Sequence, residues 1–354
     1  MPEINGYRTS ESAAALDEWI ISVWRSSPYW DESKFKLIIG GRNGTDWAQI
    51  STENTPSGAF VTFNLYNGRL WEDFPGQVGE GFTYSDTYVY EVLQSATTRW
   101  LPFMDDLYGW LDPLNAQRAL DGLPTIIPMS YEDNQTSDRL PSPDTTQQDL
   151  DDQQAAWWSN ALQTAFVDQS MAVSSRGWGG GTFLGIKGGG GQFFQGKSPS
   201  SRGGAITSAM QFRGLMNREF LPGNITKIEG PRVVAHPVVD QSGVLIPDAG
   251  QLGAYLVEGQ GKKAIVLTSL RIPGQGIDTD MGSGAGNGVT EVKIKAPGSF
   301  TAARIHTCGG IYSDHNSTLA TKDDLNLEFS DVAVLDGFMT YDLQPGKWAL
   351  IEFL

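Results

Sequence analysis

The chain has 354 residues, 40% of them hydrophobic, which is enough for two or three domains with hydrophobic cores. Its 25 Lys and Arg residues against 41 Asp and Glu residues give a net charge of −16, which excludes a general electrostatic attraction to nucleic acid or anionic lipid. The single cysteine, Cys308, excludes an intrachain disulfide framework and a metal site built from thiolates.

The sequence predicts neither a signal peptide nor a membrane span. The first seven residues lack a basic start and an apolar core, so they do not resemble a signal peptide. No stretch approaches 18 consecutive apolar residues, so no membrane span is predicted. The sequence leaves localisation open.

Helix and strand patterns alternate over the first 175 residues. Residues 10–25 predict a helix, with Leu16, Ile20 and Val23 on one side and a Ser-rich start that can cap it. Short apolar runs predict strands, and longer periodic segments predict helices. Pro102 can interrupt the helix expected over residues 88–110. The expected strands are 35–41, 60–66 and 123–131, and the further expected helices are 88–110, 147–171 and 208–220. This alternation favours βα units around a parallel sheet.

Residues 176–204 are rich in glycine and serine. Such a stretch is typical of a mobile loop or of a backbone that closely approaches a ligand. A phosphate-binding loop is disfavoured, because Gly196-Lys197-Ser198 lacks the upstream glycine at the required spacing.

The pattern changes from about residue 233. Short alternating runs are separated by Gly, Pro, Asp and Asn, which is typical of an antiparallel β-sandwich. The expected strands are 264–269, 289–295, 302–306, 325–329 and 348–353. We therefore predict an α/β domain over residues 1–230, partly or completely (β/α) barrel-like, followed by an antiparallel β-sandwich domain over residues 231–354.

Polar and aromatic residues follow each expected strand of the α/β part. Ligand sites of parallel βα folds lie at the carboxyl ends of the strands, so these residues are candidates for binding. Amides and carboxylates bond sugar hydroxyls, and aromatic planes pack on sugar C–H surfaces. The candidates for substrate binding are Asn43, Trp47, Asn64, Tyr66, Trp71 and Tyr131, together with Trp178 in the glycine-rich stretch.

A metal or cofactor is not part of this prediction. His236, His306 and His315 all lie away from the strand ends, which argues against a His-ligated catalytic metal. Asp278 and Asp280 have the spacing of calcium ligands but lack the later glutamate of an EF-hand loop, so a solvated turn is favoured there.

Several segments together resemble the retaining clan-A glycoside hydrolases. The run Pro124-Thr-Ile-Ile-Pro-Met-Ser-Tyr-Glu132 is similar to the strand of those enzymes that ends in the nucleophile glutamate. The helix at 10–25 resembles the one after their acid/base strand, and Asn64-Leu-Tyr66 resembles their His-x-Tyr element with Asn in place of His. Residues 264–271 and 343–354 resemble the first and last strands of the sandwich that often follows their barrel.

This resemblance implies a pair of catalytic carboxyls. Glu132 would be the nucleophile, held by Tyr131 or Tyr66, and Glu3 is the candidate at the place of the acid/base. The acid/base of the family normally follows an Asn, and no Asn-Glu dipeptide occurs in this chain. Retaining enzymes keep the two carboxyls about 5–5.5 Å apart.

The same resemblance implies an incomplete barrel. Counted forward from Glu3, the chain offers about the fourth to eighth units of an eight-unit barrel, and the first three are absent. Three explanations stay open: the chain lacks the N-terminal part of the barrel, a partner chain completes it, or the resemblance is misleading.

Two classes of function fit these features. The first is a glycoside hydrolase, or its C-terminal portion, that cleaves a neutral or basic polysaccharide with retention through Glu132. The second is a non-catalytic glycan-binding protein of the structural or adhesin type, for example one associated with a virion. A catalytically inactive relative of the enzyme is a third possibility.

Overall fold

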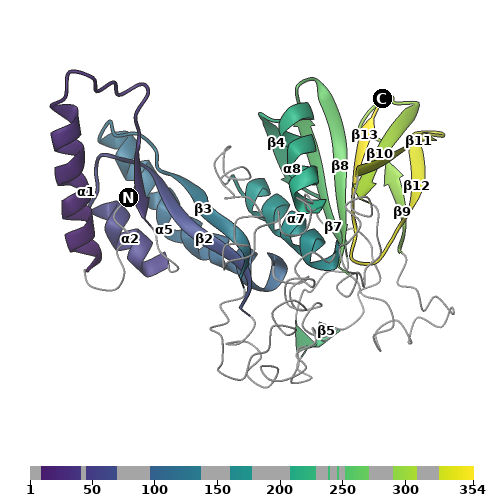
Figure 1. Ribbon diagram of the computed structural model, residues 1–354, viewed down its shortest axis with the longest axis horizontal. Coiled ribbons are helices and arrows are strands. Elements are labelled where there is room, and N and C mark those ends of the chain that lie inside the picture. The colour runs from purple at the N-terminus through teal and green to yellow at the C-terminus, as the bar shows by residue number, and fades with distance from the viewer. Residues whose placement is uncertain are drawn as a thin grey trace, which may run out of the picture. The chain divides into compact units, whose positions relative to one another are not determined.

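A computed structural model describes ten stretches of the chain, which form two compact units (Figure 1). Unit 1 comprises Met1–Leu65, Leu101–Asp133 and Gly177–Ile186, and unit 2 comprises Tyr66–Trp100, Asn134–Arg176 and Lys187–Leu354. The described residues are 9–40, 45–69, 96–136, 160–177, 208–228, 238–239, 245–246, 252–270, 290–308 and 327–354.

Unit 1 alternates helices and strands around a three-stranded sheet of order β1-β2-β3. Its elements in chain order are α1 (Ser10–Arg25), β1 (Leu37–Gly40), α2 (Thr45–Glu53), β2 (Gly58–Arg69), α5 (Leu101–Leu120) and β3 (Ile127–Thr136). β1 and β2 are parallel, with Ile39 opposite Val61 and Gly40 opposite Thr62. The predicted strands at 35–41, 60–66 and 123–131 are thus present, and α2 is an element that the sequence did not predict.

α1 has the predicted bounds but buries a different side from the expected one. The Thr9 hydroxyl accepts a hydrogen bond from the Ser12 N–H at 3.3 Å and caps the helix. The residues that α1 buries are Ser10, Ala13, Ala14 and Ile21. The predicted stripe of Leu16, Ile20 and Val23 lies outside this buried set, because small alanines let the helix approach its neighbours more closely than bulky side chains would.

Unit 2 contains a β-sandwich. A six-stranded sheet of order β11-β10-β13-β8-β7-β4 packs against the two-stranded sheet β12-β9. The strands are β4 (Gly223–Lys227), β7 (Leu252–Gly259), β8 (Lys262–Ser269), β9 (Thr290–Lys295), β10 (Ala302–Cys308), β11 (Leu327–Ala333), β12 (Phe338–Leu343) and β13 (Trp348–Phe353), with a separate short pair β5 (Val238–Val239) and β6 (Leu245–Ile246). Side chains such as Ile265, Ile305, Ile351, Ile294 and Met339 fill the core between the two sheets.

Two helices cover the other face of the six-stranded sheet. α7 (Asn160–Ser175) and α8 (Ser208–Glu219) lie on this face, while β9 and β12 lie on the opposite side (Figure 1). The Phe212 ring of α8 meets the buried Trp348 ring of β13 edge to face, with centroids 5.0 Å apart. A π-helical turn, η1 (Ala96–Trp100), contacts α7 and precedes α5, so the helix type changes just before Pro102.

A buried carboxyl joins α7 to the sheet. The Asp168 Oδ1 atom accepts hydrogen bonds from the Thr268 hydroxyl at 2.6 Å and from the Tyr255 hydroxyl at 2.9 Å. A Cβ atom on Gly253 would lie 1.9 Å from this oxygen, so the contact requires a glycine there. Burial raises the pKa of Asp168 to about 6, although both hydroxyls and Lys227 act in the opposite direction.

The predicted class, an α/β part followed by antiparallel sheets, matches this architecture. The six-stranded sheet already begins at β4, which pairs with β7 in antiparallel fashion from Gly223 onward. The domain ranges 1–230 and 231–354 stay a prediction. Among the described helices, none is both long and apolar enough to cross a bilayer.

Candidate active site

The strands of unit 1 are positioned by two side chains of α5. Buried Arg118 donates from Nε to the Pro124 carbonyl at 2.8 Å, and from an Nη atom to the Pro56 and Gly58 carbonyls at 3.0 and 2.9 Å. The Asn115 amide exchanges two hydrogen bonds with the backbone of Ile126, at 2.8 and 3.0 Å. These contacts hold the beginnings of β2 and β3 at the same end of the sheet, so both strands lead toward its other end.

A second polar cluster fixes the turn that leads into β2. The Glu18 carboxylate accepts hydrogen bonds from the Ser57 N–H at 2.7 Å and from the Ser57 hydroxyl at 2.8 Å. The Arg25 guanidinium also donates to the Ser57 hydroxyl, at 2.8 Å. Together with Arg118, α1 therefore holds the turn from which β2 starts.

The predicted site residues fall into three groups. Asn64 and Tyr66 belong to β2, and Tyr131 and Glu132 belong to β3, so all four lie within strands instead of in the loops that follow them. Trp47 is half-buried in the first turn of α2. The remaining four, Glu3, Asn43, Trp71 and Trp178, lie outside the described residues.

The structure brings two of these positions onto neighbouring strands. Asn64 comes six residues after Gly58, which Arg118 holds, and Glu132 comes six residues after Ile126, which Asn115 holds. β2 and β3 are adjacent in the sheet. The backbones of these two residues therefore lie on neighbouring strands of one sheet.

One face of β2 is turned toward α5. Val61 and Phe63 are buried, and the Phe63 ring meets the Phe103 ring of α5 edge to face at 5.1 Å. Strand alternation assigns Phe60 and Thr62 to the opposite face, where the Thr62 hydroxyl donates to the Ile39 carbonyl at 3.1 Å. In a βα fold, the face that is turned away from the helices is the one that surrounds the ligand-binding end of the sheet.

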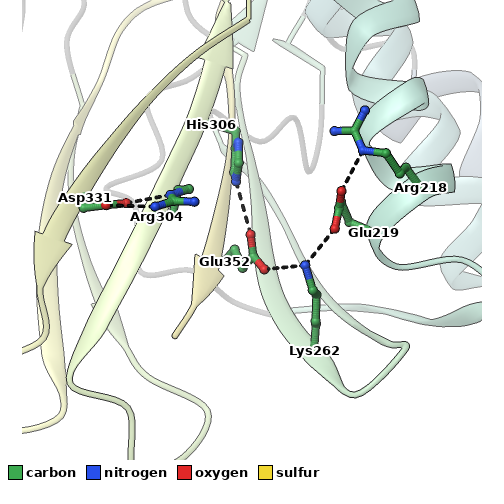
Figure 2. Close-up of polar contacts among 7 residues, drawn as sticks. All are labelled: Arg218, Glu219, Lys262, Arg304, His306, Asp331 and Glu352. Carbon is green, nitrogen blue, oxygen red and sulfur yellow. Dashed lines mark hydrogen bonds and ion pairs between the residues drawn. The ribbon is translucent and has the colours of Figure 1, made fainter.

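Unit 2 holds a chain of ionic contacts that the sequence did not reveal (Figure 2). The Glu352 carboxylate contacts the Lys262 ammonium at 2.9 Å and the His306 ring at 3.3 Å. Lys262 also contacts Glu219 at 2.7 Å, and Glu219 contacts Arg218 at 2.6 Å. A signal was present in the sequence, because Glu352 is the one charged residue of an otherwise apolar strand and so needs partners.

This ionic chain links the end of α8 to the sheet. Hydrogen bonds from Lys262 and Arg218 lower the pKa of Glu219 to about 2. Burial lowers the pKa of His306, although Glu352 acts in the opposite direction. A buried carboxylate that is shared between two partners, and whose charge is balanced by a lysine, is typical of a structural contact.

Thiol and metal chemistry find little support in the described part of the chain. Burial raises the pKa of the Cys308 thiol to about 12, which keeps it protonated and unreactive. The described residues contain no group of three His, Cys, Asp or Glu side chains that could hold a metal ion.

The sequence matches no protein-family model, and no curated protein is similar to it at a significant level. Solved structures with a similar fold include a family 51 α-L-arabinofuranosidase from Bifidobacterium longum, with a TM-score of 0.61, 12% identity, and coverage of 100% of this chain and 65% of that one. An α-L-arabinofuranosidase from Thermotoga maritima has a TM-score of 0.58 and 11% identity, with coverages of 99% and 63%. The family 51 arabinofuranosidase from Xanthomonas axonopodis pv. citri has a TM-score of 0.58 and 8% identity, with coverages of 98% and 63%.

These comparisons establish the fold. The chain has a partial βα-barrel-like part followed by a β-sandwich, as predicted, and it shares this fold with the arabinofuranosidases. It spans less than two-thirds of the length of the arabinofuranosidases that it resembles.

Proposed function

We propose that the chain is the larger part of a retaining glycoside hydrolase in which Glu132 is the nucleophile. The observation that carries this proposal is the position of Glu132 on β3, next to the strand β2 that contains Asn64, in a fold shared with arabinofuranosidases. Six residues of strand place both backbones about 20 Å from the ends that α5 holds, which is the distal end of the sheet. By strand alternation, position 64 belongs to the face of β2 that carries Thr62.

The proposed chemistry uses two carboxyls in two steps. Glu132 attacks the anomeric carbon, the glycosidic C–O bond breaks, and an acid residue protonates the departing oxygen. Water, deprotonated by that same residue, then hydrolyses the glycosyl ester and releases Glu132. Asn64 would bond a sugar hydroxyl next to the reacting carbon. Glu3, or a carboxyl of a completing polypeptide, would be the acid/base.

The proposed substrate is a neutral polysaccharide. Three of the similar structures are named as arabinofuranosidases, so α-L-arabinofuranosides are the first substrates to test. A chain with net charge −16 disfavours strongly anionic polysaccharides through long-range repulsion. The tyrosines and tryptophans predicted from the sequence, Tyr66, Tyr131, Trp47, Trp71 and Trp178, are proposed to contact sugar rings.

The test compares hydrolysis by the wild-type chain and by Glu132→Gln on a panel of aryl glycosides and polysaccharides. We expect Glu132→Gln to lower kcat by about 10³-fold or more, because the amide cannot form the glycosyl ester. Glu328→Gln, which changes an exposed carboxyl on β11, is the matched control and should retain wild-type activity. Equal activity in wild type and Glu132→Gln would remove Glu132 from the mechanism.

A glycan-binding protein without hydrolytic activity is the second candidate. It is favoured by one observation: the family's acid/base normally follows an Asn, no Asn-Glu dipeptide occurs in this sequence, and a fold without that carboxyl can retain sugar contacts. Retained binding of a polysaccharide by a wild-type chain that hydrolyses nothing on the panel would support this candidate.

A further inference from the structure

The face of the six-stranded sheet that carries α7 and α8 continues across β10 and β11. The strand register places Arg304 of β10 between Glu352 of β13 and Asp331 of β11, and it places His306 opposite Phe329. Cross-strand partners share one face of a sheet. Glu352 is 9% exposed, Arg304 is 38% exposed and Asp331 is 53% exposed, so exposure increases with distance from α8 (Figure 2).

An aromatic ring is held in place on this exposed part of the face. Phe329 is 66% exposed, and the Arg304 guanidinium carbon lies 5.0 Å from the centroid of its ring. Arg304 is itself fixed by Asp331, to which it donates from Nε at 2.7 Å and from Nη2 at 3.0 Å. Such a two-bond contact sets the plane of the guanidinium. The surface is therefore ordered before any ligand arrives, which lowers the entropic cost of binding.

The charges around this ring are balanced. Asp331 neutralises Arg304, and Lys262 neutralises Glu352 at 2.9 Å. In a chain of net charge −16, this surface is locally neutral and gives little attraction to a charged ligand. The carboxylate oxygens of Asp331 can accept hydrogen bonds from hydroxyls, and the Nη1 group of Arg304 can donate to them. An apolar ring face beside such groups suits a ligand that combines C–H faces with hydroxyls, as a neutral sugar does.

We propose that Phe329, Arg304 and Asp331 form a second, non-catalytic site that binds a neutral sugar unit of a polysaccharide. The Phe329 ring packs on a C–H face of the sugar, while Arg304 and Asp331 bond its hydroxyls. The inference rests on the proposed function for its substrate class, because a polymer held here is present at a raised effective concentration for the catalytic residues. A short aryl glycoside cannot occupy two sites at once, so this site favours polymeric substrates.

The first test measures binding without hydrolysis. The full chain carrying Glu132→Gln is run in affinity electrophoresis through gels that contain neutral arabinan or arabinoxylan. We expect Phe329→Ala in this chain to weaken binding by about 10-fold, and Phe329→Trp to keep it. Phe338→Ala is the matched control, because Phe338 is an exposed ring on the other sheet with the Lys293 ammonium 4.9 Å from its centroid, and this variant should bind normally. Circular dichroism checks that each variant is folded.

The second test measures hydrolysis by the chain with Glu132 intact. Phe329→Ala should raise KM for the polysaccharide by about 10-fold and leave the kinetic constants for an aryl glycoside unchanged. Equal polysaccharide binding with and without Phe329→Ala would overturn the inference and leave the role of Glu132 untouched. Binding that depends on Phe329 in a chain that hydrolyses nothing would support the inference and remove the proposed hydrolase. If neither polysaccharide bound and Phe329→Ala changed the oligomeric state, a second copy would occupy this surface and the inference would be wrong.

Discussion

Arg118→Ala is expected to lower the free energy of unfolding of unit 1 by about 3 kcal/mol. The guanidinium is buried and donates to the carbonyls of Pro56, Gly58 and Pro124, so its removal leaves three backbone acceptors without this donor. Arg118→Lys should lie between wild type and alanine, because an ammonium group cannot span three carbonyls as a planar fork does. Urea unfolding followed by circular dichroism measures the loss.

Arg25→Ala is the matched control for this prediction. Arg25 is 40% exposed and contacts Glu32 and Ser57, so its replacement should cost less than about 1 kcal/mol. If Arg118→Ala stayed within about 0.5 kcal/mol of wild type, Arg118 would not determine where β2 and β3 begin. The position inferred for Glu132 would then lose its support as well.

Asp168→Asn is expected to change how stability depends on pH. The pKa of Asp168 is about 6 in the folded chain, against an ordinary value of 3.8, so its carboxyl stabilises the fold below pH 4 and this contribution is lost as pH rises through 6. A difference of about two pKa units corresponds to about 3 kcal/mol. Asparagine stays neutral throughout, and its carbonyl can accept the hydrogen bonds from Thr268 and Tyr255.

The measurement is the difference in unfolding free energy between Asp168→Asn and wild type from pH 4 to pH 8. Taking the difference cancels the titration of all other groups. It should rise by about 2–3 kcal/mol in favour of the variant over this interval, most steeply near pH 5, between the two pKa values, and level off above pH 6. A difference that is constant across the interval would mean that Asp168 titrates normally and that α7 is held to the sheet in another way.

Local signals in the sequence were sufficient for much of the fold. The helix at 10–25 has the predicted bounds because Thr9 and the Ser-rich start cap it, and the last strand is present at 348–353 because its apolar run follows a clear turn. α2 was missed because nine mostly polar residues carry little periodicity. β7 was missed because Leu252–Tyr255 are all buried, so that no alternation marks this strand.

The site was predicted less completely than the fold, for physical reasons. The ends of predicted strands indicated Asn64 and Glu132, and the resemblance gave Glu132 its role, but the ends of β2 are held by Arg118 from 60 residues away, which no local pattern encodes. The partners of Glu352 and Asp168 are likewise set by sheet pairing and helix packing, which no local pattern encodes. The periodicity of α1 indicated Leu16, Ile20 and Val23 as its packed side, whereas the structure buries Ser10, Ala13, Ala14 and Ile21.

The most direct test of the account is the covalent intermediate on Glu132. The wild-type chain is quenched in acid while it turns over an aryl glycoside, and its intact mass and peptides are measured. The account predicts a mass gain of one glycosyl residue on Glu132, because retaining hydrolysis passes through a glycosyl ester. Steady hydrolysis with the glycosyl group on another residue, or with no covalent intermediate at all, would contradict it.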